Sequence, residues 1–436
     1  MKKTIAICIA AAFSLCAPAQ RVMTLAQCID YAVSHNVNVK RYANNVEQQK
    51  VQLSTARNSR LPDLTAGASQ SFNFGRGLNS GNAYVNRNTQ STGFNLQTSV
   101  PLLTGGRIPN EIAMSRLNLQ AATADLEHAR QSIALQVAAA YLQAVYAAEV
   151  VKVQEAQVAF SKIQEDRISK LFNAGKSPES DVVEAHSQVA QDEMGRTQAK
   201  CDYKLAMLDL SQLLELSSPD SIEIVAPQGE TSPTLPPLPD RIFARAEGVK
   251  PEIQAEKLRL QAAEKNIRIA KAALYPTLSL GAGLSSEYYK TSGYQAPSFS
   301  KQLSDNFNKS IGLSLNIPIF NRLATRNSIR QAKLQQSEQA LQLDETKKTL
   351  YKEIQQAWYN ALASESKYTS SSTATNASAE SFKLMSEKYD NGKATAVEYN
   401  EAKQNLMKAQ SDELQAKYEY LFRTKILDFY KGIPIE

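Results

Sequence analysis

The sequence predicts a mainly α-helical chain that also carries strands suited to a membrane β-barrel. Three observations support this fold class: an internal duplication, helical stretches of more than 60 residues, and four short segments in which apolar and polar residues alternate. Alternation is the period of a strand, whereas long stretches without proline are typical of helices. At 436 residues, length alone would suggest two or three ordinary domains, but this pattern argues against that organisation.

The second half of the chain repeats the first at a nearly constant offset. Val100-Pro101 recurs as Ile317-Pro318, and Ala174-Gly175-Lys176 recurs as Asn391-Gly392-Lys393, both 217 residues later. A duplicated half of this kind cannot bury its own hydrophobic face and needs its sibling or further copies. We predict a first repeat at 20–216 and a second at 241–436, joined by an extended, proline-rich linker at 217–240.

The N-terminus has the composition of a secretory signal peptide. Lys2 and Lys3 precede the apolar run Ile5–Leu15, and Ala17-Pro18-Ala19 offers a cleavage site of small residues. We therefore expect residues 1–19 to be removed after export, although an N-terminal anchor helix is the alternative. No other segment is expected to be apolar enough to span a membrane as a helix. Without the two lysines of the signal, the formal charge falls from +6 to +4, which does not indicate a nucleic-acid partner.

Two cysteines remain after removal of the signal peptide, Cys28 and Cys201. A single distant pair in so long a chain is no disulfide framework. We expect both to be small buried residues rather than a bridge.

Six stretches read as helical, and two of them are exceptionally long. The helical stretches are 25–60, 105–172, 177–216, 241–274, 324–389 and 394–430. At 1.5 Å per residue, each of the two longest would reach about 100 Å, so packing like that of a coiled coil is expected. Alanines at three- and four-residue spacing, such as Ala140, Ala144 and Ala148, would let neighbouring helices approach closely. Each repeat thus ends in a long helical hairpin, at 105–216 and at 324–430.

Each repeat also contains one predicted β-hairpin, at 62–101 and at 276–318. One face of these strands is apolar, and the other holds small neutral groups such as Thr65, Gly67 and Ser69. This pattern suits a wall that faces lipid on one side and a watery lumen on the other. The loops Gly75–Gln90 and Lys290–Asn306 have turn composition. Proline ends a helix and removes a ladder donor, which fits the four helix–strand junctions, at Pro62, Pro101, Pro276 and Pro318.

Four strands cannot close a barrel, and open strand edges in hydrocarbon leave backbone groups unpaired. Membrane barrels need at least about eight strands, so two chains would supply enough. Three chains would supply twelve, and only the larger barrel leaves an open lumen. The sequence therefore predicts an assembly of two or more chains, with a preference for three.

Together these features resemble the TolC-like outer-membrane efflux protein family. The most specific segments are the strand-to-helix passages, 100–107 and 317–322, and the helical hairpin tips, 171–182 and 388–399. The resemblance implies a homotrimer in the outer membrane of a Gram-negative bacterium. In it, a 12-stranded barrel continues into an α-barrel that crosses the periplasm, where a periplasmic adaptor protein joins it to an inner-membrane pump. No cofactor or metal is implied, and the cargo remains open.

The hairpin tips carry the candidate functional residues. Gly175 and Gly392 are placed where a left-handed turn is needed. Glu398 and Glu401 lie on one helix face and would form rings of carboxylates in a trimer, which can bind cations at a narrow mouth. The resemblance assigns Glu398, Glu401 and Tyr389 to the periplasmic gate, although Ala394 replaces the arginine of the family pattern, which leaves an ionic latch in doubt. The alternative is that these acids only stabilise the start of a helix.

The other tip residues are assigned to contact with the adaptor protein. They are Gly175, Lys176, Asp181, Glu184, Gly392 and Lys393, with plain solvation as the alternative for Asp181 and Glu184. No catalytic residue is predicted, because His35, His128 and His186 form no metal or catalytic pattern. The rival interpretation is a secreted structural or adhesive helical stalk without a pore. It would not explain why both repeats contain an amphipathic hairpin.

Overall fold

The computed structural model describes residues 21–78, 82–226 and 237–433. The predicted signal peptide, residues 1–19, lies outside the described residues. Two compact units cut across the two repeats: of the described residues, the helical unit contains 21–44, 123–226, 237–254 and 345–433, and the sheet unit contains 45–78, 82–122 and 255–344. Each unit therefore combines segments of both repeats.

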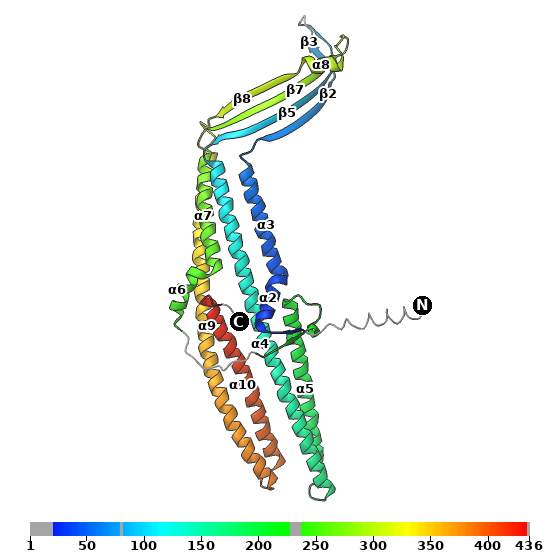
Figure 1. Ribbon diagram of the computed structural model, residues 1–436, viewed down its shortest axis with the longest axis vertical. Coiled ribbons are helices and arrows are strands. Elements are labelled where there is room, and N and C mark those ends of the chain that lie inside the picture. Colours follow the sequence, from blue (N-terminus) through cyan, green and yellow to red (C-terminus); the bar gives the residue numbers. More distant parts are fainter. Residues whose placement is uncertain (1–20, 79–81, 227–236, 434–436) are drawn as a thin grey trace, which may run out of the picture. The chain divides into compact units, whose positions relative to one another are not determined.

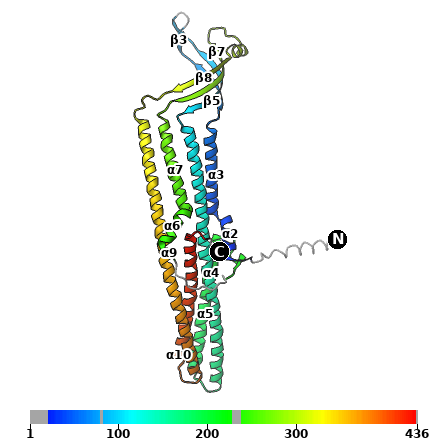
Figure 2. The same cartoon turned by 60° about the vertical axis from the view of Figure 1, so that its left-hand side comes forward.

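Every long helix of the first repeat has a counterpart of equal length in the second. The pairs are α2 (Leu25–His35) with α6 (Pro239–Val249), 11 residues each; α3 (Val37–Asn58) with α7 (Pro251–Ala272), 22 each; α4 (Arg107–Asn173) with α9 (Ala324–Asp390), 67 each; and α5 (Glu179–Leu213) with α10 (Ala396–Tyr430), 35 each. The long hairpins are α4–α5 and α9–α10 (Figures 1 and 2).

Two predicted helices are each divided in the structure, which corrects the sequence interpretation. The stretch 25–60 breaks at Asn36, whose amide donates to the Leu213 carbonyl over 3.3 Å and whose side-chain oxygen accepts from the Asn38 amide. The stretch 241–274 breaks at Lys250, because Pro251 starts a new helix and disfavours helical backbone in the residue before it.

The Ser/Thr-rich stretch 369–381 is helical and lies within the predicted helix 324–389. Its hydroxyl groups bond within the helix, with Thr369 donating to the Glu365 carbonyl and Thr373 to that of Thr369. Thr375 instead donates to the Ala409 carbonyl of α10 over 2.9 Å. The hydroxyls therefore find partners without interrupting α9, and one of them ties α9 to α10.

The four main strands form one antiparallel sheet in the order β2-β5-β7-β8 (Figure 1). They are β2 (Asp63–Asn73), β5 (Thr89–Thr104), β7 (Thr277–Thr291) and β8 (Asn308–Asn316). The central β5–β7 pair joins the two repeats, so β2 and β8 are the outer strands. The two hairpins predicted from alternation are therefore confirmed, and they combine into a single sheet.

The register aligns the two predicted faces across all four strands. Val100, Leu280 and Leu313 form one apolar row, and Leu103, Leu278 and Leu315 form another. On the opposite face, Ser99 pairs with Gly281, which pairs with Gly312. In a single chain, nothing covers the apolar side chains of the outer strands: Leu64 is 70% exposed and Ile311 is 77% exposed. A sheet of this kind requires an apolar medium on one side.

The loops between the strands contain structure that their turn composition did not predict. The first holds a small hairpin, β3 (Arg76–Leu78) with β4 (Tyr84–Asn86), and the second holds α8 (Phe299–Asp305). Ser298 caps α8, and the Gln302 side chain accepts from the Tyr289 amide, which ties this helix to β7.

Three of the four junction prolines stand where they were expected. Pro62 and Pro276 directly precede β2 and β7, and Pro318 follows the end of β8. Pro101 differs, because it lies inside β5, at a register irregularity three residues before that strand ends. A bulge accommodates a residue that cannot donate to the ladder.

The linker also differs from the prediction of a simple extended connection. Residues Pro219–Ser221 form a 3₁₀ turn, and β6 (Ile222–Ile224) pairs in parallel with β1 (Arg21–Met23). The buried Tyr141 hydroxyl of α4 donates to the Val225 carbonyl over 2.6 Å and so fastens this strand pair to the helical unit.

Two further expectations are corrected. Cys28 is buried, which raises the pKa of its thiol to about 11, but Cys201 is exposed, and the two are not bridged. Helix α4 does contain an 18-residue window long and apolar enough to cross a membrane by length and composition, although 44% of that window is buried in the structure. Its alanine-rich stripe packs against neighbouring helices, with Val137 and Ala144 fully buried.

Candidate functional site at the helical hairpin tips

Both helical hairpins turn on a left-handed glycine. Gly175 has φ of 71° and Gly392 has φ of 69°. In the first tip the Gly175 amide bonds to the Phe172 carbonyl and the Lys176 amide to that of Leu171, both over 2.8 Å. The second tip repeats this pair of bonds at Gly392 and Lys393. This is the Schellman end of a helix, which satisfies the last carbonyls and favours glycine at the left-handed position.

The helix after the second turn begins with a reciprocal cap. The Thr395 hydroxyl accepts from the Glu398 amide, and the Glu398 carboxylate accepts from the Thr395 amide over 2.8 Å. These bonds to Thr395 lower the pKa of the Glu398 carboxyl. Glu398 thus stabilises the start of α10, as the alternative interpretation of this residue expected, whereas Glu401 is exposed one turn further along the helix.

The first tip begins its second helix differently. Pro178 occupies the capping position of α5 and provides no side-chain cap. The half-buried Asp181 carboxylate accepts from the Ser177 hydroxyl over 2.7 Å, and Glu184 accepts from the Asn400 amide of α10 over 3.4 Å. Because Asn400 belongs to the other hairpin, Glu184 links the two tips.

Aromatic side chains fill the space between α9 and α10. The rings of Tyr389 and Tyr399 stack with their centroids 4.7 Å apart, and Phe382 lies 5.4 Å from Tyr399. Tyr399 is 4% exposed. Burial raises the pKa of Tyr399 to about 12 and also raises the pKa of Tyr389, with the Asp181 carboxylate adding to the second effect. Both phenols are therefore neutral donors at physiological pH.

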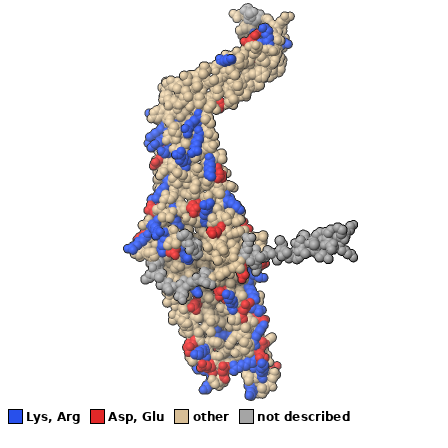
Figure 3. Space-filling model, viewed as in Figure 1, with Lys and Arg blue, Asp and Glu red and all other residues tan. Residues whose placement is uncertain are grey.

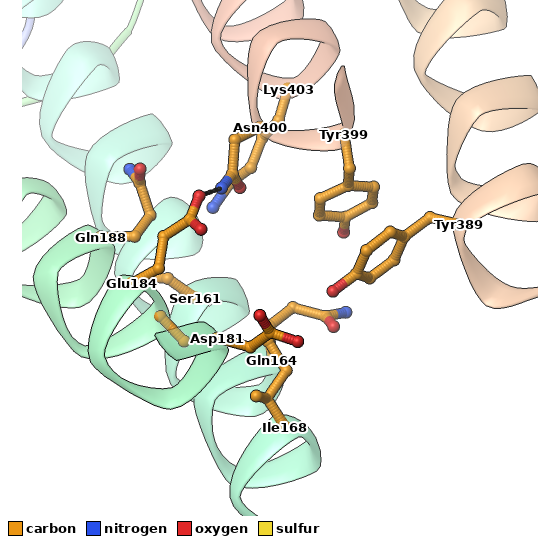
Figure 4. A pocket seen from close by; sticks show the side chains of 11 residues that line it. Ser161, Gln164, Ile168, Asp181, Glu184, Gln188, Tyr389, Tyr399, Asn400 and Lys403 are labelled. Atoms are coloured by element: carbon orange, nitrogen blue, oxygen red, sulfur yellow. Dashed lines mark hydrogen bonds between the residues drawn. The ribbon is translucent and has the colours of Figure 1, made fainter. Parts of the chain in front are cut away.

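A cavity of about 30 Å³ lies between the two hairpins, and acids and phenols meet there. Asp181, Glu184 and Gln164 line it from the first hairpin, opposite Tyr389 and Tyr399 from the second (Figure 4). This volume holds one or two water molecules. The structure therefore brings together Tyr389, Asp181 and Glu184, which the sequence placed on separate hairpins and in separate roles.

Two ion pairs that the sequence did not reveal also join the hairpins. Arg167 of α4 contacts Asp390 of α9 over 2.6 Å in a half-exposed pair. Lys403 of α10 contacts Asp192 of α5 over 3.4 Å, and their side chains are only 6% and 7% exposed. Asp192 also accepts from the amides of Gln157 and Gln188. Desolvation lowers the pKa of Lys403.

Comparison with known proteins identifies the family. Residues 28–215 and 244–429 match the family model described as outer membrane efflux protein, which is most of the chain and includes both repeats. The chain belongs to the outer membrane efflux protein family. It is accordingly an outer-membrane efflux channel protein rather than an enzyme, and the interpretation as a stalk without a pore is set aside.

Relatives of this efflux protein match along nearly its whole length. The outer membrane efflux protein BepC of Brucella suis biovar 1 is 24% identical over 390 residues, which cover 87% of this chain and 81% of BepC. The outer membrane protein TolC of Escherichia coli K12 is 24% identical over 430 residues, which cover 97% of this chain and 84% of TolC.

Solved structures of outer-membrane channels share the fold of this efflux protein. The Campylobacter jejuni CmeC outer membrane channel has a TM-score of 0.76 at 20% identity, with 94% of this chain and 85% of CmeC covered. The open state of the Neisseria gonorrhoeae MtrE outer membrane channel has a TM-score of 0.73 at 20% identity, with 94% and 88% covered.

Proposed function

We propose that three copies of this efflux protein form one continuous channel that receives cargo from an inner-membrane pump through a periplasmic adaptor. The observation that carries the proposal is the four-stranded sheet, which is apolar on one exposed face and ends in unpaired edges at β2 and β8. Unpaired backbone groups cost several kcal/mol each in hydrocarbon, so the edges of one copy must pair with those of the next. Three copies give twelve strands and an open lumen.

The stoichiometry can be tested on the purified mature protein in detergent. We expect native mass spectrometry to show a trimer, and we expect planar bilayers that contain it to conduct ions. A dimer would give a barrel of eight strands and only a small conductance. A monomer that remains soluble and folded in buffer without detergent would contradict the proposal.

The repeat organisation itself stays an inference. We infer that residues 20–216 and 241–436 arose by duplication and that residues 1–19 direct export. The equal lengths of the four helix pairs and the constant offsets support the duplication. N-terminal sequencing of the mature protein tests the cleavage site.

We propose that Glu398, Glu401 and Tyr389 form the periplasmic gate. In a trimer each acid becomes a ring of three carboxylates, which would attract cations at a narrow mouth. The two acids are not equivalent in the chain, because Glu398 accepts the capping bonds of Thr395 while Glu401 is exposed. Glu401 therefore has the carboxylate that is not used in capping, and Tyr389 stacks on Tyr399 between α9 and α10.

Single-channel recordings test this assignment. Glu401→Gln is expected to reduce the preference for cations more than Glu398→Gln, and Tyr389→Ala is expected to raise the conductance by loosening the aromatic stack. Glu338→Gln, at an exposed position of α9 far from the tip in sequence, is the control and should leave both properties unchanged. Unaltered currents in all three tip variants would refute the gate.

We further propose that the tips contact the adaptor protein through Gly175, Lys176, Gly392 and Lys393, with Asp181 and Glu184 beside them. Lys176 and Lys393 are exposed at equivalent positions of the two turns. Asp181 and Glu184 line the cavity between the hairpins instead, so their part in the contact is indirect. Charge reversal by Lys176→Glu and Lys393→Glu should reduce crosslinking to the adaptor, with Lys204→Glu as the control; equal crosslinking would exclude this surface.

A further inference from the structure

The helix ends that adjoin the sheet are strongly basic. The stretches 57–62, 105–116, 264–276 and 317–333 run from the four helix–strand junctions into the neighbouring helices, and we call them the basic collar. They contain eleven Lys or Arg and two Glu, a formal charge of +9, whereas the whole chain carries +6. In Figure 3, Lys and Arg gather over the helices beside the sheet. The proposed channel function assigns no role to this charge.

The most regular part of the basic collar is on α9. Arg326, Arg330 and Lys333 are spaced by four and three residues, so they share one face of the helix, and Arg322 precedes them in the turn after β8. All four side chains are exposed. Among the residues that the structure describes, no carboxylate lies close enough to form a salt bridge with any of them.

The neighbouring helices extend the same charge. Arg57 and Arg60 stand at the end of α3, and Arg268 and Lys271 stand near the end of α7, each pair three residues apart and exposed. Arg107 differs, because it pairs with Glu111 over 2.8 Å. Most of the collar is therefore not neutralised within the described chain, and like charges held together need an external anion to offset their repulsion.

Exposed apolar side chains lie at the sheet end of the basic collar and in the last residues of β5, ahead of the cations. Ile319 is 95% exposed and Phe320 77%, and Leu102, Leu103 and Tyr275 are also exposed at these junctions. The order from the sheet outward is thus an apolar band, then apolar and aromatic side chains, then cations. A bilayer has the same order of hydrocarbon, interface and headgroup, and its polar layer is about 5–7 Å thick on each side.

The distances along α9 fit that layer. Arg322 lies just before α9, and at 1.5 Å per residue Arg330 lies about 6 Å and Lys333 about 10 Å beyond Arg326 along the helix. The first two arginines would reach the headgroup layer itself. Arg330 would lie within one Debye length, about 8 Å at physiological ionic strength, of its surface, and Lys333 would lie slightly beyond that length.

We propose that the basic collar binds anionic phospholipid headgroups, in the membrane leaflet nearer the helices. The phosphate oxygens would accept from the guanidinium groups of Arg322 and Arg326, a pairing that Arg favours because of its planar, forked donors. This proposal rests on the proposed embedding of the sheet in the membrane. It adds a lipid preference that barrel formation alone does not require.

The test uses the full-length protein in nanodiscs of phosphatidylcholine with or without phosphatidylglycerol. The variant is Arg322→Gln/Arg326→Gln/Arg330→Gln. The matched control is Lys204→Gln/Lys383→Gln/Lys408→Gln, three exposed cations of the helical unit that give the same loss of charge. Lipid that remains bound after detergent exchange is quantified by mass spectrometry, and thermal unfolding is followed in parallel.

We expect the wild type and the control to retain phosphatidylglycerol several-fold over phosphatidylcholine, and we expect the collar variant to lose this preference. High salt should weaken the preference of the wild type as well, because screening shortens the reach of the charges. Equal retention by the variant and the control would overturn the proposal. A variant that keeps its lipid but changes anion conductance would place these cations in the lumen and also overturn it. Failure of the wild type to enter nanodiscs would instead contradict the membrane-embedded sheet.

Discussion

The two repeats use the same backbone at their strand-to-helix turns but fill it with different side chains. Gly105 and Gly106 have φ of 59° and 83°, and 217 residues later Arg322 and Leu323 have φ of 54° and 64°. Glycine adopts this region freely, whereas other residues pay about 1–2 kcal/mol for it. Only the first turn is crowded: a Cβ on Gly105 would lie 2.6 Å from the Ala272 carbonyl oxygen. The duplication therefore preserved the path of the chain, and local crowding decided where glycine is required.

The two hairpin tips also share a backbone conformation but differ in the side chains that follow it. Both turn on a glycine with the same pair of backbone bonds, yet only the second tip starts its next helix with a side-chain cap. The first tip uses its acids toward the other hairpin instead, through Glu184 and Asn400. The two tips thus share a backbone conformation, but Glu184 bonds to the other hairpin whereas Glu398 caps its own helix.

The largest effect is expected where the two repeats contact each other through buried charge. Lys403→Met would leave Asp192 buried without its cation and should cost about 3–5 kcal/mol. The double variant Lys403→Met/Asp192→Leu should recover much of that loss. Thermal or denaturant unfolding of these two variants and of Asp192→Leu gives the coupling energy as a double-mutant cycle, and additive losses would show that the pair does not act as a unit.

The comparison of the strand-to-helix turns is sharpened by exchanging residue types. Gly105→Ala should destabilise the protein by about 2–4 kcal/mol, because a strained φ and a clash with the Ala272 carbonyl act together. Arg322→Gly should change the stability by less than about 1 kcal/mol, since relief of strain offsets the added freedom of the unfolded chain. Equal losses in the two variants would mean that crowding does not distinguish the turns.

The hairpin tips should respond equally to loss of glycine. Gly175→Ala and Gly392→Ala are each expected to cost about 1 kcal/mol, because both glycines have positive φ and open space around the missing Cβ. Gly248→Ala is the matched control within α6, where alanine should stabilise the helix by up to about 1 kcal/mol. The unfolding free energies of the three variants test this prediction, and clearly unequal losses at Gly175 and Gly392 would contradict it.

The smallest effects concern the helix starts after the tips. Thr395→Ala should cost about 1 kcal/mol through loss of the cap, while Pro178→Ala, at the uncapped equivalent position, should cost less. The unfolding free energies of the two variants test this difference.

The start of α10 should also depend on pH through Glu398. The pKa of Glu398 is lowered in the folded chain, so its contribution to stability is present above the unfolded value of about 4.3 and is lost as the pH falls through the folded pKa. Protection factors of the amides in the first turn of α10, which correct for the intrinsic pH dependence of hydrogen exchange, should therefore fall at acid pH in the wild type, and a Glu398→Gln variant should show no such fall.

The elements of this protein were largely predictable from its residues. Unbroken helical composition fixed α4, α5, α9 and α10 to within a few residues, and alternation fixed the strands and their two faces. The missed breaks at Asn36 and Lys250 arise from short-range events, a side-chain turn and a following proline, within otherwise helical composition. The candidate site was predicted only in part, since Tyr389 and Asp181 were visible but their meeting across a cavity was not.

The sequence by itself determined the duplication, the period of each element and the apolar and polar faces of the sheet, because these depend on spacing along the chain. Only the tertiary structure decided that Lys403 meets Asp192, that Tyr399 is buried behind Tyr389, and that the cations of four separate helices gather beside one sheet. These contacts join residues far apart in sequence, and their partners follow from how the repeats pack against each other. No local pattern of residues carries that information.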